Sequence, residues 1–432
     1  MQDSFIEDGI LYRQHTFSLP LDYARTSEKQ IKVFARELVD ESRRDCELPW
    51  LVYLQGGPGY PSPRPGSASG WMKRALRDHR VLLLDQRGTG NSTPVTHQTL
   101  AHMTVEQQVD YLSLFRADNI VRDAEEIRQH MGIKKWSLLG QSFGGFCSLT
   151  YLSFYPESLK QVYITGGVPS LSRHADDVYR ATYQRVKDKN AAFFAQFPKA
   201  QTLCRKVADY LDNNEVMLPN GQRFTTQQFQ LIGINFGGSG AYLPMYYLLE
   251  EAFVDLNGQE TLSYTFLNEM LAQQSYQTNP IYAILHEPIY NQQFASQWSA
   301  NRVRNTEYPE FNYQAGQPFL FTGEMVFPWM FEQLNNLKPL KQAAEKLAEK
   351  SDWSNVYNPE QLSKNKVPVA CAVYADDMYV EMDYSRETLR NIPNSKAWIT
   401  NEYEHNGLRA DGERILDKLI SMADSIEALP TS

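Results

Sequence analysis

The chain has 432 residues, of which 42% are hydrophobic and 22% charged, a composition typical of a globular protein. This length exceeds what one small core needs, so we expect one large domain with an insertion, or two domains. The formal net charge is −9 and no long basic run occurs, which argues against binding of nucleic acids through their phosphates.

The N-terminal stretch MQDSFIEDGILYRQ is polar and acidic, without the basic and apolar regions of a signal peptide. No apolar run approaches the roughly 18 residues that cross a bilayer. The cysteines are scattered, without a CxxC pair or metal-ligand spacing, at Cys46, Cys147, Cys204 and Cys371. We therefore expect a reduced cytoplasmic protein with no membrane segment and no structural metal.

Strand and helix patterns alternate along the first 168 residues. Apolar or alternating runs predict strands at 31–39, 49–55, 80–86, 136–140 and 160–167. Helical spacing predicts helices at 119–132 and 143–155, the second of which stops before Pro156. This alternation predicts an α/β fold with a mainly parallel sheet.

The pattern changes after about residue 168. Residues 170–215 have amphipathic helical spacing, and residues 224–331 are crowded with aromatic side chains. Strand patterns return at 366–377 and 395–405, before a closing helix at 412–426. We therefore predict a sheet domain in two parts, 1–168 and 366–432, with a large and mostly helical cap at 169–365 over the C-terminal edge of the sheet.

The segment GQSFGG, residues 140–145, lies between a predicted strand and a predicted helix. In such a strand–turn–helix the turn lifts Ser142 above the sheet, and the glycines allow the strand and helix backbones to approach. The N–H of Phe143 then lies at a helix N-terminus, where it can stabilise an oxyanion. The alternative is a glycine-rich turn with a solvated serine, but the context favours a nucleophile.

A second glycine-rich loop, LQGGPGY at 54–60, follows a buried strand. In α/β hydrolases the loop after this strand supplies another oxyanion donor. Our candidate is the N–H of Gly57, because Pro58 has none. Taken alone, this segment could be a simple turn.

In a serine hydrolase of this fold, the acid and then the histidine follow the serine along the chain. Three histidines follow, at positions 174, 286 and 405, and the first two fall inside the predicted cap. His405 comes after the last strand and before the final helix, so it is the candidate base. Asp376 and Asp377 end the preceding strand; only one of them can orient the imidazole, and we favour Asp377.

Several separated motifs in this chain resemble those of the prolyl aminopeptidases, also called proline iminopeptidases, of the α/β-hydrolase superfamily (peptidase family S33). They are LQGGPGYPS, LLLDQRGTGNS, VRDAEEIR, GQSFGGFCSLTYLSFYPESLKQVYITGG, YADDMYV and EYEHNGLR. The length and the large cap resemble the longer bacterial branch of this family. Gln55 departs from the histidine that precedes GGPG in the shorter enzymes.

The resemblance implies a serine exopeptidase that removes the N-terminal proline from small peptides without a cofactor. Carboxylates must then hold the cationic imino group of the substrate. The cap offers acidic residues among aromatic ones as candidates, each of which could instead be an ordinary surface or ion-pair carboxylate: Glu250, Glu251, Glu287 and Glu324. A broader aminopeptidase or an esterase on the same scaffold is the alternative function.

Overall fold

The computed structural model describes residues 4–25 and 29–427. Within them, nine strands form one sheet in the order β1-β2-β3-β5-β4-β6-β7-β12-β13. These strands are β1 (Ser4–Glu7), β2 (Ile10–Pro20), β3 (Gln30–Asp40), β4 (Trp50–Leu54), β5 (Arg80–Asp85), β6 (Trp136–Gln141), β7 (Leu159–Thr165), β12 (Val369–Tyr374) and β13 (Ser395–Thr400).

The sheet is mainly parallel, as the alternation of strands and helices predicts. Strands β5, β4, β6, β7, β12 and β13 run parallel to one another. Strands β1, β2 and β3 form an antiparallel edge, in which β3 pairs with β5. The sequence analysis finds β3 but misses β1 and β2, because part of β2 faces solvent and its apolar residues do not alternate regularly.

Helices cover both faces of the sheet. Those associated with it are α1 (Gly70–Leu76), α4 (Ala117–His130), α5 (Phe143–Phe154), α15 (Pro359–Leu362), α16 (Met382–Arg390), α17 (Gly407–Ala410) and α18 (Gly412–Glu427). Neighbouring residues of β4 point to opposite faces: Val52 and Leu54 pack in the core with α4 and α5, while Leu51 and Tyr53 pack with α1 and α18. Burial on both faces explains why β4 is apolar throughout.

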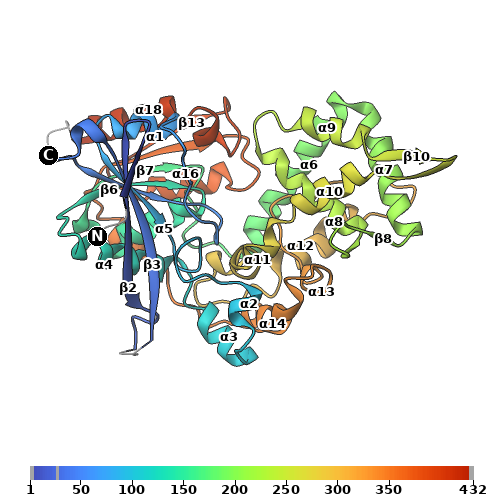
Figure 1. Cartoon of the computed structure of the whole chain (residues 1–432), viewed down its shortest axis with the longest axis horizontal. Coiled ribbons are helices and arrows are strands. Elements are labelled where there is room, and N and C mark those ends of the chain that lie inside the picture. The colour runs from blue at the N-terminus through green and yellow to red at the C-terminus, as the bar shows by residue number, and fades with distance from the viewer. Residues whose placement is uncertain (1–3, 26–28, 428–432) are drawn as a thin grey trace.

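A second, mostly helical lobe follows β7. Figure 1 shows it beside the sheet, with α6 to α10 on the side away from the sheet. Its helices are α6 (Ala175–Gln196), α7 (Pro198–Asn213), α8 (Thr226–Gln230), α9 (Tyr242–Glu250), α10 (Tyr264–Ala272), α11 (Pro280–Leu285), α12 (Ser299–Glu307), α13 (Met330–Gln333) and α14 (Lys341–Glu349). Two hairpins, β8 (Val216–Met217) with β9 (Arg223–Phe224) and β10 (Phe253–Leu256) with β11 (Gln259–Leu262), interrupt it.

Packing crosses the boundaries that the sequence predicts for this lobe. Helices α2 (His97–Leu100) and α3 (Val105–Leu112) precede β6 in the chain, yet Leu100 and Leu112 belong to the aromatic core of the helical lobe, and α3 packs on α14. Conversely, Val356 and Leu362 pack with α5 under the sheet. Helices α2 and α3 therefore pack in the core of the helical lobe, and the segment around residues 356–362 packs in the core of the sheet.

Candidate active site

Ser142 lies at the sharp turn between β6 and α5. Its φ of 54° and ψ of −124° form a strained combination that residues with a side chain seldom adopt. A Cβ atom on Gly144 would overlap the carbonyl oxygen of Leu54 in β4, and one on Gly145 would overlap that of Gly167. These glycines let α5 approach the sheet closely, and the tight packing holds Ser142 in its strained turn.

His405 follows β13, and Asp377 follows the adjacent strand β12. The imidazole Nδ1–H donates a hydrogen bond of 2.7 Å to Oδ2 of Asp377. The other carboxylate oxygen of Asp377 accepts backbone N–H bonds from Tyr379 and Val380, at 2.8 and 3.2 Å. Asp377 is buried, whereas Asp376 is exposed. Of the two aspartates that the sequence offers, it is therefore Asp377 that faces the imidazole.

The pKa of His405 reflects two opposing effects. Burial disfavours the imidazolium, but the negative charge of Asp377 and its hydrogen bond outweigh burial and raise the pKa above its ordinary value. Nε2 of His405 lies 3.5 Å from the side-chain nitrogen of Gln141, the residue before Ser142. The nitrogen that is not held by Asp377 thus faces the turn that carries the serine.

Two backbone N–H groups near Ser142 lack a hydrogen-bond acceptor within residues 4–25 and 29–427. One belongs to Phe143, the first residue of α5, and the other to Gly57, in the loop after β4. This loop touches the serine turn, because a Cβ atom on Gly56 would lie 2.8 Å from Cβ of Ser142. N–H groups at the start of a helix carry partial positive charge and suit an anionic oxygen.

A cavity of about 1050 Å³ opens beside His405, between the sheet and the helical lobe. Gln55 and Gln141 line it from the sheet, and Asn235, Gln273 and Ser275 line it from the helical lobe. Hence both lobes contribute to the space next to the imidazole.

Aromatic side chains border this cavity. The ring of Tyr379 packs edge-on against His405, with centroids 4.6 Å apart. Tyr60 shares a hydrogen bond of 2.7 Å with Ser275 and packs edge-on against Tyr282. A small apolar ring could therefore lie against aromatic surfaces near the imidazole.

A serine on a strained turn, an imidazole held by a buried carboxylate and two free N–H groups suit acyl transfer. A family model described as alpha/beta hydrolase fold matches residues 49–408. The proline iminopeptidase of Aeromonas sobria is 58% identical to this chain over 420 residues, which cover 97% of this chain and 98% of that relative. The chain belongs to the proline iminopeptidase family of α/β hydrolases.

A second relative extends this similarity to a fungal protein. Proline iminopeptidase aneH of Aspergillus aculeatus is 34% identical over 439 residues, covering 98% of this chain and 96% of the relative. Among solved structures, that of a proline iminopeptidase from Mycobacterium smegmatis aligns with 96% of this chain and 99% of its own, at 12% identity and a TM-score of 0.44. Membership of the family therefore rests on the sequence matches.

Glu324 is the candidate carboxylate whose charge acts on His405. Burial raises the pKa of this half-buried carboxyl to about 7, an effect that the charge of His405 and a hydrogen bond from Tyr282 oppose. In turn, the charge of Glu324 raises the pKa of His405. The Tyr282 hydroxyl donates to Glu324 over 2.7 Å, so the carboxylate has a defined position.

Glu287 is buried at the N-terminus of α12. Its two carboxylate oxygens accept N–H bonds from Ser299 and Ala300, at 3.0 and 2.9 Å. Burial raises its pKa to about 7, while these hydrogen bonds act in the opposite direction. Both Glu287 and Glu324 raise the pKa of the buried Tyr179, so both lie within electrostatic reach of one side chain. Glu287 nevertheless has a structural role at α12.

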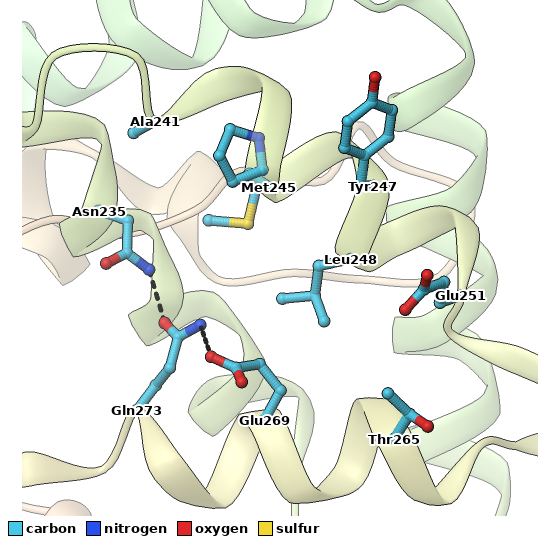
Figure 2. A pocket seen from close by; sticks show the side chains of 10 residues that line it. Asn235, Ala241, Met245, Tyr247, Leu248, Glu251, Thr265, Glu269 and Gln273 are labelled. Carbon is cyan, nitrogen blue, oxygen red and sulfur yellow. Dashed lines mark hydrogen bonds between the residues drawn. The ribbon is translucent and has the colours of Figure 1, made fainter.

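Glu250 and Glu251, the other two candidate carboxylates, do not line the cavity beside His405. They end α9, whose preceding residue Leu249 is buried, and both are exposed. Glu251 and Glu269 line a neighbouring cavity of about 500 Å³, which shares Asn235 and Gln273 with the cavity beside His405 (Figure 2). Since successive helical residues are about 100° apart, burial of Leu249 turns the glutamates outward.

Sequence reasoning missed residues that complete the site. Tyr379 follows Asp377 by two positions and packs on His405, while Tyr282 precedes Glu287 by five and holds Glu324. Tyr379 lies in YADDMYV, one of the motifs quoted above, so its aromatic ring was an available signal. Tyr282 lies outside the quoted motifs, and only the tertiary structure brings it to Glu324.

Two further observations concern the described part of the chain. No helix there is long and apolar enough to cross a membrane. Nor do those residues contain a group of three or more histidine, cysteine, aspartate or glutamate side chains that could hold a metal ion.

Proposed function

We propose that the protein is a serine exopeptidase that releases N-terminal proline from small peptides. The observation that carries this proposal is the half-buried Glu324, whose charge and that of His405 shift each other's pKa. A free N-terminal imino group is cationic, so a carboxylate beside the reacting groups selects it over blocked or internal residues. The relatives named proline iminopeptidases support the same activity.

In the proposed reaction, Ser142 attacks the carbonyl carbon of the N-terminal proline. His405 takes the serine proton through Nε2. Asp377 accepts a hydrogen bond from Nδ1–H of His405, which fixes the tautomer of the imidazole and stabilises the imidazolium. His405 then protonates the leaving amine, and the acyl enzyme forms. His405 then takes a proton from water, which attacks this ester, and gives the proton to Ser142 as proline leaves, without any cofactor.

The N–H groups of Phe143 and Gly57 are the proposed donors to the tetrahedral oxyanion. Neither N–H group donates to another acceptor among the described residues, so both can donate to the substrate oxygen without losing an existing hydrogen bond. A donor of this kind contributes about 3–4 kcal/mol to transition-state stabilisation in serine hydrolases.

Glu324 is the proposed direct contact of the imino cation. Tyr282 positions it, and Tyr60 and Tyr379 offer ring surface for the pyrrolidine. The carboxylate oxygens of Glu287 already accept hydrogen bonds from α12, so we assign it a longer-range contribution to the negative potential. Binding energy at the imino group should appear partly in catalysis, since it holds the carbonyl in place.

The cytoplasm is the proposed compartment of the reaction. All four cysteines are free, and Cys147, Cys204 and Cys371 are buried. Free thiols are typical of proteins in a reducing environment.

The test compares the 4-nitroanilides of free proline, N-acetylated proline and free alanine, with 4-nitrophenyl acetate as an uncharged ester. We expect the free-proline amide to be cleaved with the highest kcat/KM and the blocked amide not at all. Ser142→Ala should abolish hydrolysis of every substrate, which separates the enzyme from a contaminant.

Each other pattern points to a different activity. Cleavage of the ester without the free-proline amide would refute the peptidase and favour an esterase. Equal rates on proline and alanine amides would indicate a broader aminopeptidase. Equal rates on the N-acetylated and free proline amides would refute the proposal that Glu324 binds the cationic imino group.

A further inference from the structure

Arg409 lies four residues after His405, in the short helix α17, and is exposed. Its side chain lines the same cavity of about 1050 Å³ as His405. Among the described residues that line this cavity, Arg409 is the only lysine or arginine.

The guanidinium of Arg409 makes no hydrogen bond or ion pair with the described residues, whereas the acids around it are already engaged. Asp411 accepts a hydrogen bond of 2.7 Å from Tyr403. Glu413 pairs with Lys73 of α1 and with Arg77, the residue after this helix. Both acids line the cavity, yet neither neutralises Arg409. A guanidinium without a partner at such a cavity can bind an anion, above all a carboxylate, with which it forms two parallel hydrogen bonds (a bidentate pair).

Electrostatics link Arg409 to the reacting groups. Its positive charge lowers the pKa of His405, and it also opposes the rise in the pKa of Tyr53, another residue of the cavity. Glu324 acts on His405 in the opposite sense. Besides Asp377, the imidazole therefore lies within electrostatic reach of the negative charge of Glu324 and the positive charge of Arg409.

We propose that Arg409 binds the C-terminal α-carboxylate of short peptide substrates. This inference rests on the proposed function, in which Glu324 holds the cationic end of the peptide. A free di- or tripeptide carries a positive charge at one end and a negative charge at the other, so Glu324 and Arg409 offer each end a charge of the opposite sign. The part of the peptide after proline leaves as an amine that carries this carboxylate. In longer peptides the C-terminal carboxylate lies farther from the scissile bond and does not meet Arg409.

The experiment measures kcat/KM for Pro-Gly, Pro-Gly-Gly and Pro-Gly-Gly-Gly and for the C-terminal amide of each. We expect the carboxylate form to exceed its amide by about tenfold for at least one of the shorter peptides, and the ratio to fall for the longest. In Arg409→Gln this preference should disappear or reverse, because the remaining negative charge favours the cationic amide. Arg409→Lys should retain part of it.

Proline 4-nitroanilide has no carboxylate, so its kcat/KM reports only the effect of the Arg409 charge on His405 and should fall far less than that of the short peptides with a free carboxylate. A thermal midpoint equal to that of the wild type shows that both variants fold. Arg386→Gln removes one positive charge from α16, outside the cavity, and should preserve the preference for carboxylates. Wild-type enzyme that does not discriminate at any length, or a preference that survives in Arg409→Gln, would overturn the inference. Failure of the wild type to cleave proline 4-nitroanilide would instead refute the proposed function.

Discussion

The replacement Glu324→Gln tests how the enzyme selects a free N-terminus. Glutamine keeps the shape of the side chain and an oxygen that can accept the 2.7 Å hydrogen bond from Tyr282. It removes only the negative charge. A change in activity can therefore be attributed to charge rather than to a local rearrangement.

The structure sets the size of the expected effect. Burial raises the pKa of Glu324 from 4.5 to about 7, so at pH 8 the side chain is ionised and burial destabilises its charge by about 3 kcal/mol at 1.36 kcal/mol per pKa unit. The imino cation stabilises this charge on binding, and losing one partner of such a pair typically costs 2–5 kcal/mol. We therefore expect kcat/KM for proline 4-nitroanilide to fall by at least about thirtyfold at pH 8, since 1.36 kcal/mol corresponds to a factor of ten.

The assay follows kcat/KM against pH for proline 4-nitroanilide and for 4-nitrophenyl acetate. The ester has no cation, so Glu324→Gln should change its kcat/KM at pH 8 by less than about threefold. Because Glu324 raises the pKa of His405, and only the neutral imidazole acts as base, the acidic limb of the ester profile should move to lower pH in the variant. Equal losses on both substrates, or an acidic limb that moves to higher pH, would refute this reasoning.

Three further outcomes are expected. Asp377→Asn should lower kcat by about 10³–10⁴-fold, while the exposed Asp376→Asn stays within about threefold; equal losses would reverse the assignment. Gly144→Ala should prevent folding or strongly lower the thermal midpoint, because its Cβ would overlap the backbone of β4, whereas Gly66→Ala meets nothing within 4 Å and should melt like the wild type. Finally, folded Glu324 keeps a proton that the unfolded chain loses above pH 4.5, so stability should fall as pH rises from about 4.5 to about 7. Urea unfolding at pH 5 and pH 7.5 measures this fall, and Glu324→Gln should reduce it by up to about 3 kcal/mol; an unchanged fall would contradict the raised pKa.

Local patterns in the sequence predicted much of the sheet and two candidate catalytic residues, Ser142 and His405. The strands predicted at 49–55 and 136–140 correspond to β4 and β6, because burial on both faces demands continuous apolar runs. The position of Ser142 follows from the same logic, since a strand, small residues and a helix leave little freedom to the turn. His405 could be chosen because few histidines follow the serine and chain order in this fold is restricted.

Other features depend on contacts between distant residues. Whether Asp376 or Asp377 faces His405 depends on the path of the chain after β12, which two neighbouring backbone N–H groups hold by donating to Asp377. Alternation along a strand no longer applies once the strand has ended at Tyr374. Sequence periodicity therefore could not choose between the two aspartates, although we favoured Asp377.

The helical lobe shows the same limit more strongly. Its four acidic candidates have similar apolar neighbours in sequence, yet Glu250 and Glu251 are exposed, Glu287 lies at the start of α12, and Glu324 lies within reach of His405. Many helices here are short, and their directions are set by packing against segments far away in the chain, including α3. The sequence alone determined the sheet and the order of Ser142 and His405 along the chain, because local burial patterns encode them. Only the tertiary structure placed Glu324 within electrostatic reach of His405, since that depends on how distant helices pack.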